Sequence, residues 1–322
     1  MKKILILGSG GVLGYSFKEK YFLEKYKKKY KFIFINSKTI DLRKQKETID
    51  YILKEKPYAV FHLAGSGGGI GRSYNKHASI LRDNIFMIFN VIEGSRLANV
   101  KKLILTMSTG MFPEKAKIPL RESEIHNGEP VKYNFGNSFG KRIIEPAIRA
   151  YKEEYNMDIK GIIVSGIYGE GDNFNIKEAN MLPAIIRKII EAKKNNLNKI
   201  KIWGTGKPVR EYTYAKDIRN IYMKTLKIKK TVNYFNVSSL QEKSIYEFVK
   251  IVCKLVNYNF KNVYFEKNKP DGIIKKTPST KLFKSIMSYG FIRLEDGIKN
   301  TITWYLNSKD INTKSKAKEF LV

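Results

Sequence analysis

The sequence predicts an α/β fold with a doubly wound parallel sheet and a second, smaller domain towards the carboxy terminus. Over the first half of the chain, short apolar runs alternate with longer segments of helical periodicity. The apolar runs lack alternating polar residues, which is typical of parallel strands buried on both faces. With 322 residues, of which 43% are hydrophobic, the chain can bury a large core and is not a disordered protein.

Six apolar runs are expected to be strands, and the segments between them carry the periodicity of helices. The expected strands are residues 3–7, 31–35, 58–62, 102–107, 158–165 and 231–237. The expected helices are residues 13–29, 43–56, 80–98 and 138–155. Pro146 lies inside the last of these helices and is expected to kink it, because proline removes a helical hydrogen bond.

The alternation loosens in the second half of the chain. Residues 181–194 are predicted to form a helix with Pro183 in its first turn. Residues 244–256 are predicted to form an amphipathic helix that buries Cys253 as a structural thiol. The stretch 203–214 is expected to be a loop, because it contains two glycines and a proline.

Composition limits the classes of partner. Lys and Arg number 61 against 30 Asp and Glu, which gives a formal net charge of +31. Such a balance first suggests nucleic acid, but the lysines are scattered, and the chain has neither a zinc-finger spacing nor an RNA-binding aromatic motif. We therefore expect no nucleic-acid partner, and a basic surface that attracts an anionic small substrate.

Membrane, disulfide and metal signals are weak in this sequence. No apolar run approaches the roughly 18 residues of a membrane span, and the apolar stretch near the start is too short for a signal peptide. A single cysteine excludes an internal disulfide, and three histidines leave little for a metal centre. We expect a cytoplasmic protein with no membrane partner and no metal ion.

A glycine-rich turn directly follows the first expected strand and opens the first expected helix. Gly8, Gly11 and Gly14 have the spacing G-x-x-G-x-x-G. In such turns the first glycine permits a tight turn, the second lets a pyrophosphate approach the backbone, and the third allows close helix–strand packing. The N–H groups at the helix start, around Val12 and Leu13, then face the phosphates. This placement predicts a Rossmann-type dinucleotide site.

The end of the second expected strand indicates which dinucleotide binds. NAD enzymes usually place an acidic residue there for the ribose 2′-hydroxyl, but this chain has Asn36, Ser37 and Lys38. Lys38 can pair with a 2′-phosphate, which favours NADP(H) over NAD; the alternative is that Lys38 is one more surface lysine. We expect Ser37, Lys38 and Asp41 to contact the cofactor.

Further ligand-binding residues are expected where the third strand ends, because ligands bind at the carboxyl ends of strands in such sheets. His62 ends that strand, and Leu63 and Ala64 lead into a glycine-rich stretch at 65–71. We expect Leu63 and Ala64 to contact the cofactor. The alternative for the glycine-rich stretch is a flexible surface loop.

Longer local patterns indicate a family. They are HLA-x(3)-GG at 62–69, Ser-Thr-Gly-Met-Phe-Pro at 108–113, Ile-His-Asn-Gly at 125–128, Asn-Phe-Gly at 134–136, Asp-Asn-Phe-Asn at 172–175, Trp-Gly-Thr-Gly-Lys-Pro at 203–208, and Asp-Gly followed by Lys-Lys at 271–276. Through these motifs, to about residue 290, the chain resembles the GDP-L-fucose synthases of the extended short-chain dehydrogenase/reductase superfamily. The resemblance implies a sheet domain that binds NADP(H), a smaller carboxy-terminal domain that holds a GDP-sugar, and a homodimer joined through residues 80–98 and 138–155.

The resemblance also implies a chemistry in two halves. In the family, a cysteine and a histidine move protons at carbons 3 and 5 of a 4-keto sugar; NADPH then reduces carbon 4, while a Ser/Tyr/Lys trio handles the oxygen. Ser108 and Lys141 match this trio, but Asn137 stands at the tyrosine position. The cysteine position is Gly110 and the histidine position is Asn180, so we expect the 3,5-epimerase activity to be lost.

Five positions of the GDP-sugar site are carried over by the resemblance. Trp203, Arg210 and Lys276 match substrate-binding residues. Lys188 replaces the basic residue that meets the diphosphate, and Asn180 lines the same site.

Glycines at five positions stand where the family carries larger residues, and one of them, Gly166, replaces an asparagine. With an unchanged backbone, they leave more room around the sugar, which suits a heptose as well as a hexose. The alternative is that the loops collapse inward. The five are Gly65, Gly67, Gly71, Gly110 and Gly166.

We therefore expect an NADP-binding domain at 1–168 with a return segment near 212–240, a substrate-binding domain at 169–211 and 241–305, and a polar tail at 306–322. The expected function is NADPH-dependent reduction of the 4-keto group of a GDP-4-keto-sugar, for surface-polysaccharide synthesis. Two alternatives stay open: a catalytically silent homologue that binds NADP and a GDP-sugar, and a full bifunctional GDP-L-fucose synthase in which other residues replace those that are lost.

Overall fold

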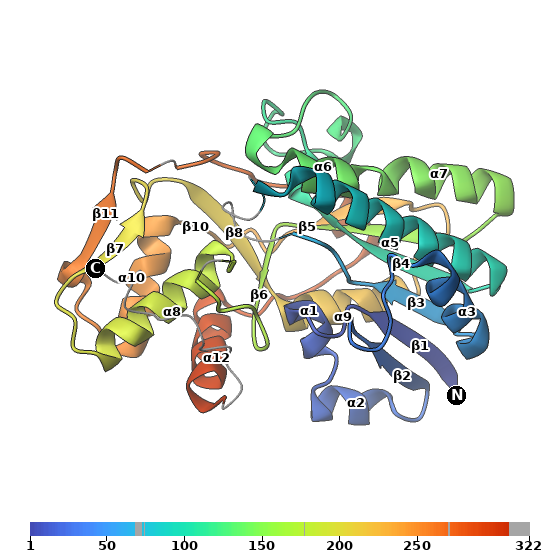
Figure 1. Cartoon of the computed structure of the whole chain (residues 1–322), viewed down its shortest axis with the longest axis horizontal. Helices are drawn as coiled ribbons and strands as arrows, with labels where there is room; N and C mark the ends of the chain where they lie inside the picture. The colour runs from blue at the N-terminus through green and yellow to red at the C-terminus, as the bar shows by residue number, and fades with distance from the viewer. Residues whose placement is uncertain (68–72, 74, 177, 270, 309–322) are drawn as a thin grey trace.

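The computed structural model describes residues 1–308 except 68–72, 74, 177 and 270. Its main sheet has parallel strands in the order β2-β1-β3-β4-β5-β9 (Figure 1). The strands are β1 (Lys2–Leu7), β2 (Tyr30–Ile35), β3 (Ala59–His62), β4 (Lys102–Ser108), β5 (Ile159–Val164) and β9 (Tyr234–Val237). The strand order reverses between β1 and β3, which confirms the predicted doubly wound fold and places the switch point at that pair.

Helices cover both faces of this sheet. One face carries α3 (Gln45–Glu55), α5 (His77–Leu97) and α7 (Ile144–Tyr155), with α6 (Phe135–Arg142) packed on α5; the other carries α1 (Val12–Ser16), α2 (Lys20–Tyr26), α9 (Ala215–Thr225) and α11 (Lys281–Ile286). Val60 belongs to the first core and its neighbour Phe61 to the second. Because successive side chains of a strand face opposite sides, a strand between two cores must be apolar throughout.

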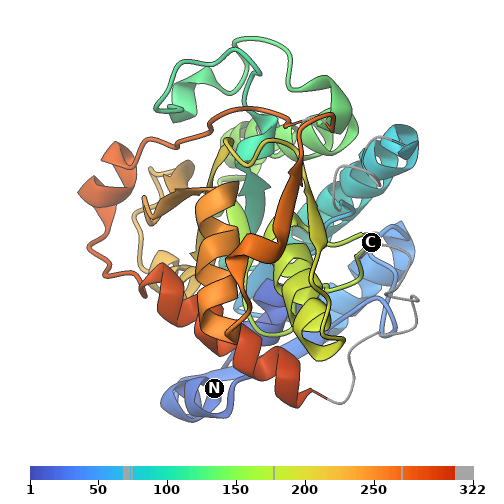
Figure 2. The same ribbon diagram turned by 90° about the vertical axis from the view of Figure 1, so that its left-hand side faces the viewer.

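A second domain packs around its own apolar core beside the sheet domain (Figures 1 and 2). Its helices are α8 (Met181–Lys194), α10 (Ile245–Val256) and α12 (Leu294–Asn307). Its sheets have the orders β10-β8-β6 and β11-β7, with β6 at Gly166–Tyr168, β7 at Ile200–Trp203, β8 at Val209–Tyr214, β10 at Glu242–Ser244 and β11 at Val263–Glu266. Short 3₁₀ turns are η1 (Thr109–Met111), η2 (Glu122–Glu124), η3 (Lys132–Asn134) and η4 (Phe260–Asn262).

The prediction of one continuous helix at 13–29 is wrong. The structure has two short helices there, α1 and α2, and the chain turns between them. Phe17 is fully buried against the sheet, and Glu19 is extended rather than helical. The Glu19 carboxylate binds the guanidinium of Arg219 on α9 at 2.6 Å. The break lets the ring and the carboxylate both reach the α9 side of the sheet.

The expected helix at 138–155 begins earlier and is divided at Ile143 into α6 and α7. Pro146 therefore lies in the first turn of α7. Our expectation that it kinks a continuous helix is wrong. The first N–H groups of a helix have no helical partner, so a proline there costs no hydrogen bond.

Residues 209–214, expected to be part of a loop, form β8 and pair with both β6 and β10. The glycines that suggested a loop occupy only the preceding turn, where Gly204 and Gly206 have φ of +83° and +78°. By contrast, α8 and α10 lie where the periodicity predicts them, and Cys253 is a buried free thiol, as predicted.

Side-chain packing bears on the domain boundaries, which stay a proposal. Tyr168, Tyr212 and Tyr214 pack into the core of the second domain. Phe283 and Met287, from the segment that we expected in the second domain, pack against the sheet. The part of the expected tail beyond residue 308 lies outside the described residues.

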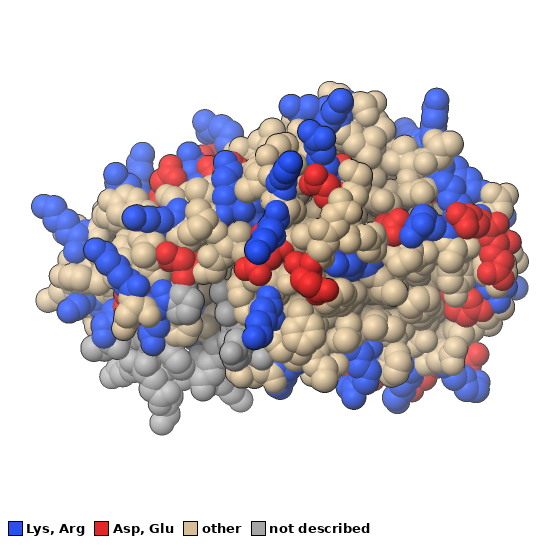
Figure 3. Space-filling view, turned by 90° about the horizontal axis from the view of Figure 1, so that it is seen from above, with Lys and Arg blue, Asp and Glu red and all other residues tan. Residues whose placement is uncertain are grey.

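The basic charge of the chain is dispersed on the face shown in Figure 3. Lys and Arg side chains are spread over that face, with Asp and Glu between them. In the described ranges, no helix combines the length and the apolar character that crossing a bilayer requires.

Candidate active site

The glycine turn after β1 is a tight cradle. Gly8 has φ of +95°, and a Cβ on it would lie 2.5 Å from the backbone nitrogen of Ala64. A Cβ on Gly14 would lie 2.4 Å from the carbonyl oxygen of Gly8, so both positions require glycine. Gly11 is the N-cap of α1, with no side chain to shield the N–H groups that begin at Val12. This geometry fits the phosphates of a dinucleotide.

Leu13, the other helix residue expected at this site, is 5% exposed and packs into the sheet core. The structure therefore gives its side chain a packing role. Its backbone belongs to the first turn of α1.

The turn after β2 presents a lysine and no free carboxylate. Asn36 Oδ1 accepts the backbone N–H of Lys38 at 2.9 Å, and the side chains of Ser37 and Lys38 are exposed. The Asp41 carboxylate is occupied by Arg43, through Nε to Oδ1 and Nη2 to Oδ2, both at 2.8 Å. Hydrogen bonding to Arg43 lowers the pKa of Asp41 to about 2. This edge fits a 2′-phosphate better than a ribose hydroxyl.

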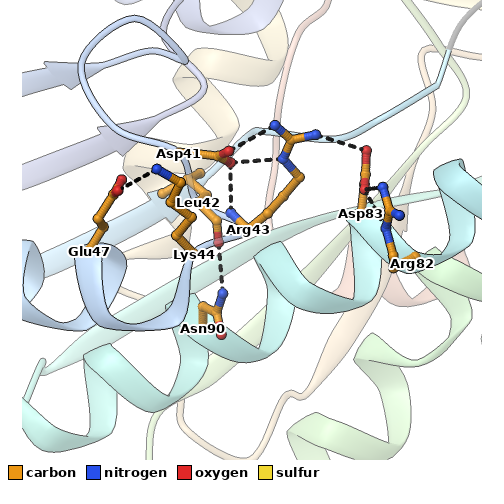
Figure 4. Close-up of polar contacts among 8 residues, drawn as sticks. All are labelled: Asp41, Leu42, Arg43, Lys44, Glu47, Arg82, Asp83 and Asn90. Carbon is orange, nitrogen blue, oxygen red and sulfur yellow. Dashed lines mark hydrogen bonds and ion pairs between the residues drawn. The ribbon is translucent and has the colours of Figure 1, made fainter.

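Ion pairs and a hydrogen bond connect the same turn to α5 (Figure 4). Arg43 Nη1 reaches the carboxylate of Asp83 at 3.3 Å, and Arg82 also binds Asp83 at 2.9 Å. Asn90 Nδ2 donates to the carbonyl oxygen of Leu42 at 2.9 Å. These contacts fix the loop that carries Lys38 and Asp41 relative to the sheet.

Lys141 meets the cradle at the end of β3. Its Nζ donates to the carbonyl oxygen of Ala64 at 3.2 Å, and the N–H groups of Leu63 and Ala64 both donate to Leu7 of β1, at 2.8 and 3.1 Å. Beneath them His62 is fully buried; burial, and then the charge of Lys141, lower its pKa to about 3. A neutral imidazole thus lies under the switch point.

Asn137 and Lys141 lie one helical turn apart on α6, so they share a face. Asn137 Oδ1 accepts from Nδ2 of Asn84 at 3.5 Å. Within the described residues, no tyrosine hydroxyl bonds to the Lys141 ammonium. Burial lowers the pKa of Lys141 to about 8. The trio position of the family is therefore filled here by an amide beside a buried amine.

Glycines let α6 approach α5 closely enough for this arrangement. A Cβ on Gly136 would lie 2.4 Å from the carbonyl oxygen of His77, and a Cβ on Gly140 would lie 2.9 Å from Cβ of Asn84. Larger residues would push α6, and with it Lys141, away from the sheet.

Ser108 lies at the carboxyl end of β4, on the same edge of the sheet. Its Oγ accepts the backbone N–H of Gly110 at 3.1 Å. The carbonyl oxygen of Gly110 in turn accepts from Oγ of Ser138 on α6 at 2.8 Å, and Ser138 accepts from Nδ2 of Asn134 at 3.3 Å. A small hydroxyl and amide network therefore stands where the family chemistry would place a thiol.

The expectation of extra room does not hold at two of the glycines. A Cβ on Gly166 would lie 2.5 Å from the ring of Tyr212, which fills that space. A Cβ on Gly110 would lie 3.2 Å from Asn134 Nδ2 and 3.3 Å from Ser108 Oγ. Neighbouring side chains have taken up the volume that the glycines release.

The glycines after β3 differ from one another. A Cβ on Gly65 would lie 3.0 Å from Lys141 Nζ, whereas a Cβ on Gly67 would lie 3.6 Å from Asn137 Oδ1, an ordinary contact. Gly71, and the two glycines of the HLA-x(3)-GG motif, lie outside the described residues.

A second group of polar side chains, in the carboxy-terminal domain, is suited to anions. Burial lowers the pKa of Arg210, whose Nη1 donates to the carbonyl oxygens of Val209 and Ile273 at 2.9 and 2.6 Å. Burial, and then the nearby charge of Arg210, lower the pKa of Lys276 to about 8, with Glu114 acting in the opposite direction. Two partly buried cations near each other favour a bound anion.

The remaining expected substrate residues are more dispersed. Lys188 Nζ donates to the carbonyl oxygen of Lys201 at 3.1 Å, and burial lowers its pKa. Asn180 is the N-cap of α8 but makes no capping bond through its side chain, which is exposed. Trp203 is 62% exposed, with Lys269 5.7 Å from its ring centre. No contact among the described residues joins these three side chains to one another.

Three residues of this region were not anticipated. Asn84 interrupts an apolar stripe that contains Ile80 and Ile88, a detectable signal for a buried polar role. Tyr133 on η3 places its hydroxyl 3.3 Å from the position of a Cβ on Gly272. Neither Tyr133 nor Tyr212 carries a local signal, since their neighbours come from distant parts of the chain.

Comparison with known proteins agrees with this geometry. The NAD dependent epimerase/dehydratase family model matches residues 4–238. A GDP-L-fucose synthase of Dictyostelium discoideum is 32% identical over 97% of this chain and 98% of its own length. A GDP-L-colitose synthase of Yersinia pseudotuberculosis is 31% identical over 96% of this chain and 99% of its own length.

Solved structures show the same fold. A GDP-L-fucose synthetase of Naegleria fowleri bound to NADP superposes with a TM-score of 0.87 and 29% identity, covering 95% of this chain and 92% of that one. A GDP-mannoheptose C4 reductase of Campylobacter jejuni, with NADP bound, has a TM-score of 0.83 and 25% identity, covering 95% and 98%. The chain described here belongs to the NAD dependent epimerase/dehydratase family and, within it, to the GDP-L-fucose synthase family.

Proposed function

We propose that this protein is an NADPH-dependent reductase of the 4-keto group of a GDP-4-keto-sugar. One observation carries the proposal: the glycine cradle and Lys141 meet at Ala64. Gly8 packs on the Ala64 backbone nitrogen, and the Ala64 carbonyl oxygen accepts from the Lys141 ammonium. A dinucleotide in the cradle and a reacting carbonyl next to Lys141 would then be neighbours at the switch point of the sheet.

NADP(H) is the cofactor that these residues suit. When bound, it supplies the hydride that reduces the ketone. Gly8, Gly11 and Gly14 would hold its phosphates, and the exposed side chain of Lys38 would hold the 2′-phosphate, since Asp41 is already paired with Arg43. Relatives with NADP bound support this assignment.

The GDP-sugar would lie between the two domains, with its diphosphate at the buried cations. Arg210 and Lys276 bring two positive charges together in a partly desolvated place, where charge-assisted hydrogen bonds to phosphate are strong. Lys188 adds a third buried amine in the same domain. The names of the relatives support GDP as the carrier.

Ser108 and Asn137 would orient the carbonyl oxygen without titrating. The Ser108 hydroxyl and the Asn137 amide can each donate a hydrogen bond to an oxygen that gains negative charge. Amides do not exchange a proton in ordinary acid–base catalysis. The residues thus support positioning of the ketone, with the proton coming from another group.

We propose that 3,5-epimerisation is absent. That reaction needs a base on one face of the sugar and an acid on the other. Gly110 has no side chain, and its neighbours Ser108 and Asn134 are a hydroxyl and an amide. Asn180 does not titrate. Incubation with GDP-4-keto-6-deoxymannose in deuterated water should leave carbons 3 and 5 unlabelled; deuterium at either carbon would show the full bifunctional reaction.

The reductase proposal is tested with NADPH and a panel of GDP-4-keto hexoses and heptoses, by following the absorbance of the reduced nicotinamide. We expect oxidation with at least one member. Because Tyr212 fills the space at Gly166, the preference between hexose and heptose is decided elsewhere in the pocket. A GDP-mannoheptose C4 reductase among the similar structures makes heptoses an essential part of the panel.

One observation, the amide at position 137, favours a second candidate, a silent protein that binds NADP and a GDP-sugar. It predicts tight binding of both and no absorbance change across the panel. We also propose a cytoplasmic homodimer that makes a sugar for surface polysaccharide. As the resemblance implies, it would be joined through residues 80–98 on α5 and residues 138–155 on α6 and α7.

A further inference from the structure

The Lys141 ammonium is buried and keeps donors to spare. The residue is 8% exposed, and its polar contact within the described residues is the Ala64 carbonyl oxygen. An ammonium carries three donors, so two of them are not spent on that contact. Gly65 is exposed, and a Cβ there would lie 3.0 Å from Nζ and 3.2 Å from Cε. With glycine at position 65, the amine packs directly against the backbone of this exposed residue, and no side chain lies between them.

Asn84 holds the backbone next to Gly65 in place. The Oδ1 atom of Asn84 accepts the backbone N–H of Ser66 at 2.8 Å, and its Nδ2 donates to the Ser66 carbonyl oxygen at 2.8 Å. Asn84 has no exposed surface and comes from the middle of α5. The backbone of Ser66, next to Gly65, is therefore held at both of its polar groups, which fixes the backbone against which the Lys141 amine packs.

Among the residues that the structure describes, no carboxylate bonds to this lysine, and burial is what shifts its pKa. His62, at the end of β3, feels the charge of Lys141, and Oδ1 of Asn84 on α5 lies near the same Gly65 position as the amine. Asn137 lies one helical turn before Lys141 on α6, and Ser108 ends the neighbouring strand β4. His62 is neutral at physiological pH, because its pKa is lowered to about 3, and the others do not titrate. Asp83, next to Asn84, has its carboxylate bound to Arg43 and Arg82.

An amine in this setting differs from the lysine of a Ser/Tyr/Lys trio, which keeps its proton and acts through the phenol. Burial lowers the pKa of Lys141 to about 8, near the pH at which a general acid works best. At the tyrosine position Asn137 has no proton to give. Lys141 is thus the titratable group that the structure offers to the reacting oxygen.

We propose that the ammonium of Lys141 is itself the proton donor for the sugar oxygen at carbon 4, and this rests on the proposed ketoreductase function. As carbon 4 accepts the hydride of NADPH, its oxygen gains negative charge, an N–H bond of Lys141 breaks, and the O–H bond of the alcohol forms. The products are the alcohol, NADP⁺ and a neutral amine. Water that enters beside Gly65 then returns a proton to Nζ.

The first test uses the whole protein without cofactor or substrate. Competitive acetylation across a pH series, read by peptide mass spectrometry, gives the titration midpoint of Lys141. We expect a midpoint about two units below the ordinary range of lysine near 10.4. A midpoint within that ordinary range would overturn the proposal even if the protein reduces ketosugars.

The second test compares Gly65→Ala with Gly67→Ala. A methyl at position 65 would meet Nζ, whereas one at position 67 would meet Asn137 at an ordinary distance. We expect Gly65→Ala to slow both the acetylation of Lys141 and the reduction step several-fold, and Gly67→Ala to leave the acetylation unchanged. Equal acetylation and equal reduction rates in Gly65→Ala and the unaltered protein would overturn the proposal.

The third test is the pH dependence of the single-turnover reduction rate. With Lys141 as the proton donor, the reduction rate falls as pH rises through about 8, because the amine loses its proton. In Asn137→Tyr the phenol becomes the proton donor, so the rate should fall at a different pH. An unchanged profile in Asn137→Tyr contradicts the donor role of Lys141. If the unaltered protein reduces no ketosugar while Lys141 still titrates near 8, the ketoreductase function itself is contradicted.

Discussion

Asn84 Nδ2 donates to Asn137 Oδ1 at 3.5 Å, so the α6 position where the family chemistry calls for a phenol is part of an amide pair. Asn84 is also the residue that fixes the Ser66 backbone. The pair joins the loop after β3 to the helix that carries Lys141. Changes at Asn137 therefore probe both proton delivery and the shape of the site.

Asn137→Tyr should accelerate ketone reduction. It adds the phenol that serves as the proton donor in the family chemistry, and a well-placed general acid typically contributes about 10²–10⁴-fold in rate. Gly67 leaves space opposite the side chain, since a Cβ there would be 3.6 Å from Asn137 Oδ1. The measurement is single-turnover oxidation of NADPH. Asn137→Phe is the matched control, because it adds the ring without the hydroxyl; equal acceleration by both variants would show that the ring alone is responsible.

Lys276→Met should weaken GDP-sugar binding, while Lys275→Met should not. Lys276 lies beside Arg210 with its charge partly desolvated, whereas Lys275 is paired with Glu242 at 2.9 Å and is 43% exposed. Loss of a charge-assisted contact corresponds to a rise in KM of about 10–100-fold, with kcat changed less. Steady-state kinetics, or calorimetry with GDP, measures it. Equal effects of both substitutions would contradict the assigned diphosphate site.

Gly166→Asn should destabilise the fold by about 1–3 kcal/mol, because the added side chain overlaps the buried ring of Tyr212. Gly290→Asn is the control: a Cβ there meets nothing within 4 Å, so its effect should stay within about 0.5 kcal/mol. Urea unfolding of both variants gives the free energies. An unchanged free energy of unfolding in Gly166→Asn would mean that Tyr212 does not occupy that space.

Asp172→Asn should stabilise the protein at pH 8 and have little effect below about pH 4. Burial raises the pKa of Asp172 to about 7, against one opposing hydrogen bond from the backbone N–H of Asn173, and its Oδ2 has no hydrogen-bond partner among the described residues. When the pKa of a carboxyl is higher in the folded than in the unfolded protein, the free energy of unfolding falls as pH rises from the unfolded pKa to the folded one. Urea unfolding at pH 4 and pH 8 gives the free energies of unfolding of the two proteins. The same difference in free energy at both pH values would contradict the raised pKa of Asp172.

Much of the fold could be predicted from local sequence. Strands buried on both faces must be apolar throughout, and the glycines at 8 and 14 follow from backbone clashes with Ala64 and Gly8, so both features leave a clear pattern. The break after Phe17 could not be predicted in this way. It depends on Glu19 reaching Arg219, about 200 positions later in the chain.

The candidate site shows the same division. The positions of Ser108 and Lys141 follow from motifs, but the consequence of a lost side chain depends on what enters the space. Tyr212 fills the volume at Gly166, whereas the Lys141 amine lies where a side chain at Gly65 would be. Both are glycines in sequence, and only their three-dimensional neighbours show which residue takes the space that each one leaves.

The most direct test of the proposed function follows a labelled hydride. The protein is given NADPH that carries deuterium at the transferred position of the nicotinamide, together with the GDP-4-keto-sugar panel, and the products are analysed by mass spectrometry and NMR. The account predicts one deuterium at carbon 4 of the sugar and none taken from the solvent at carbons 3 and 5. Tight binding of both ligands with no deuterium at carbon 4 of any sugar would contradict it.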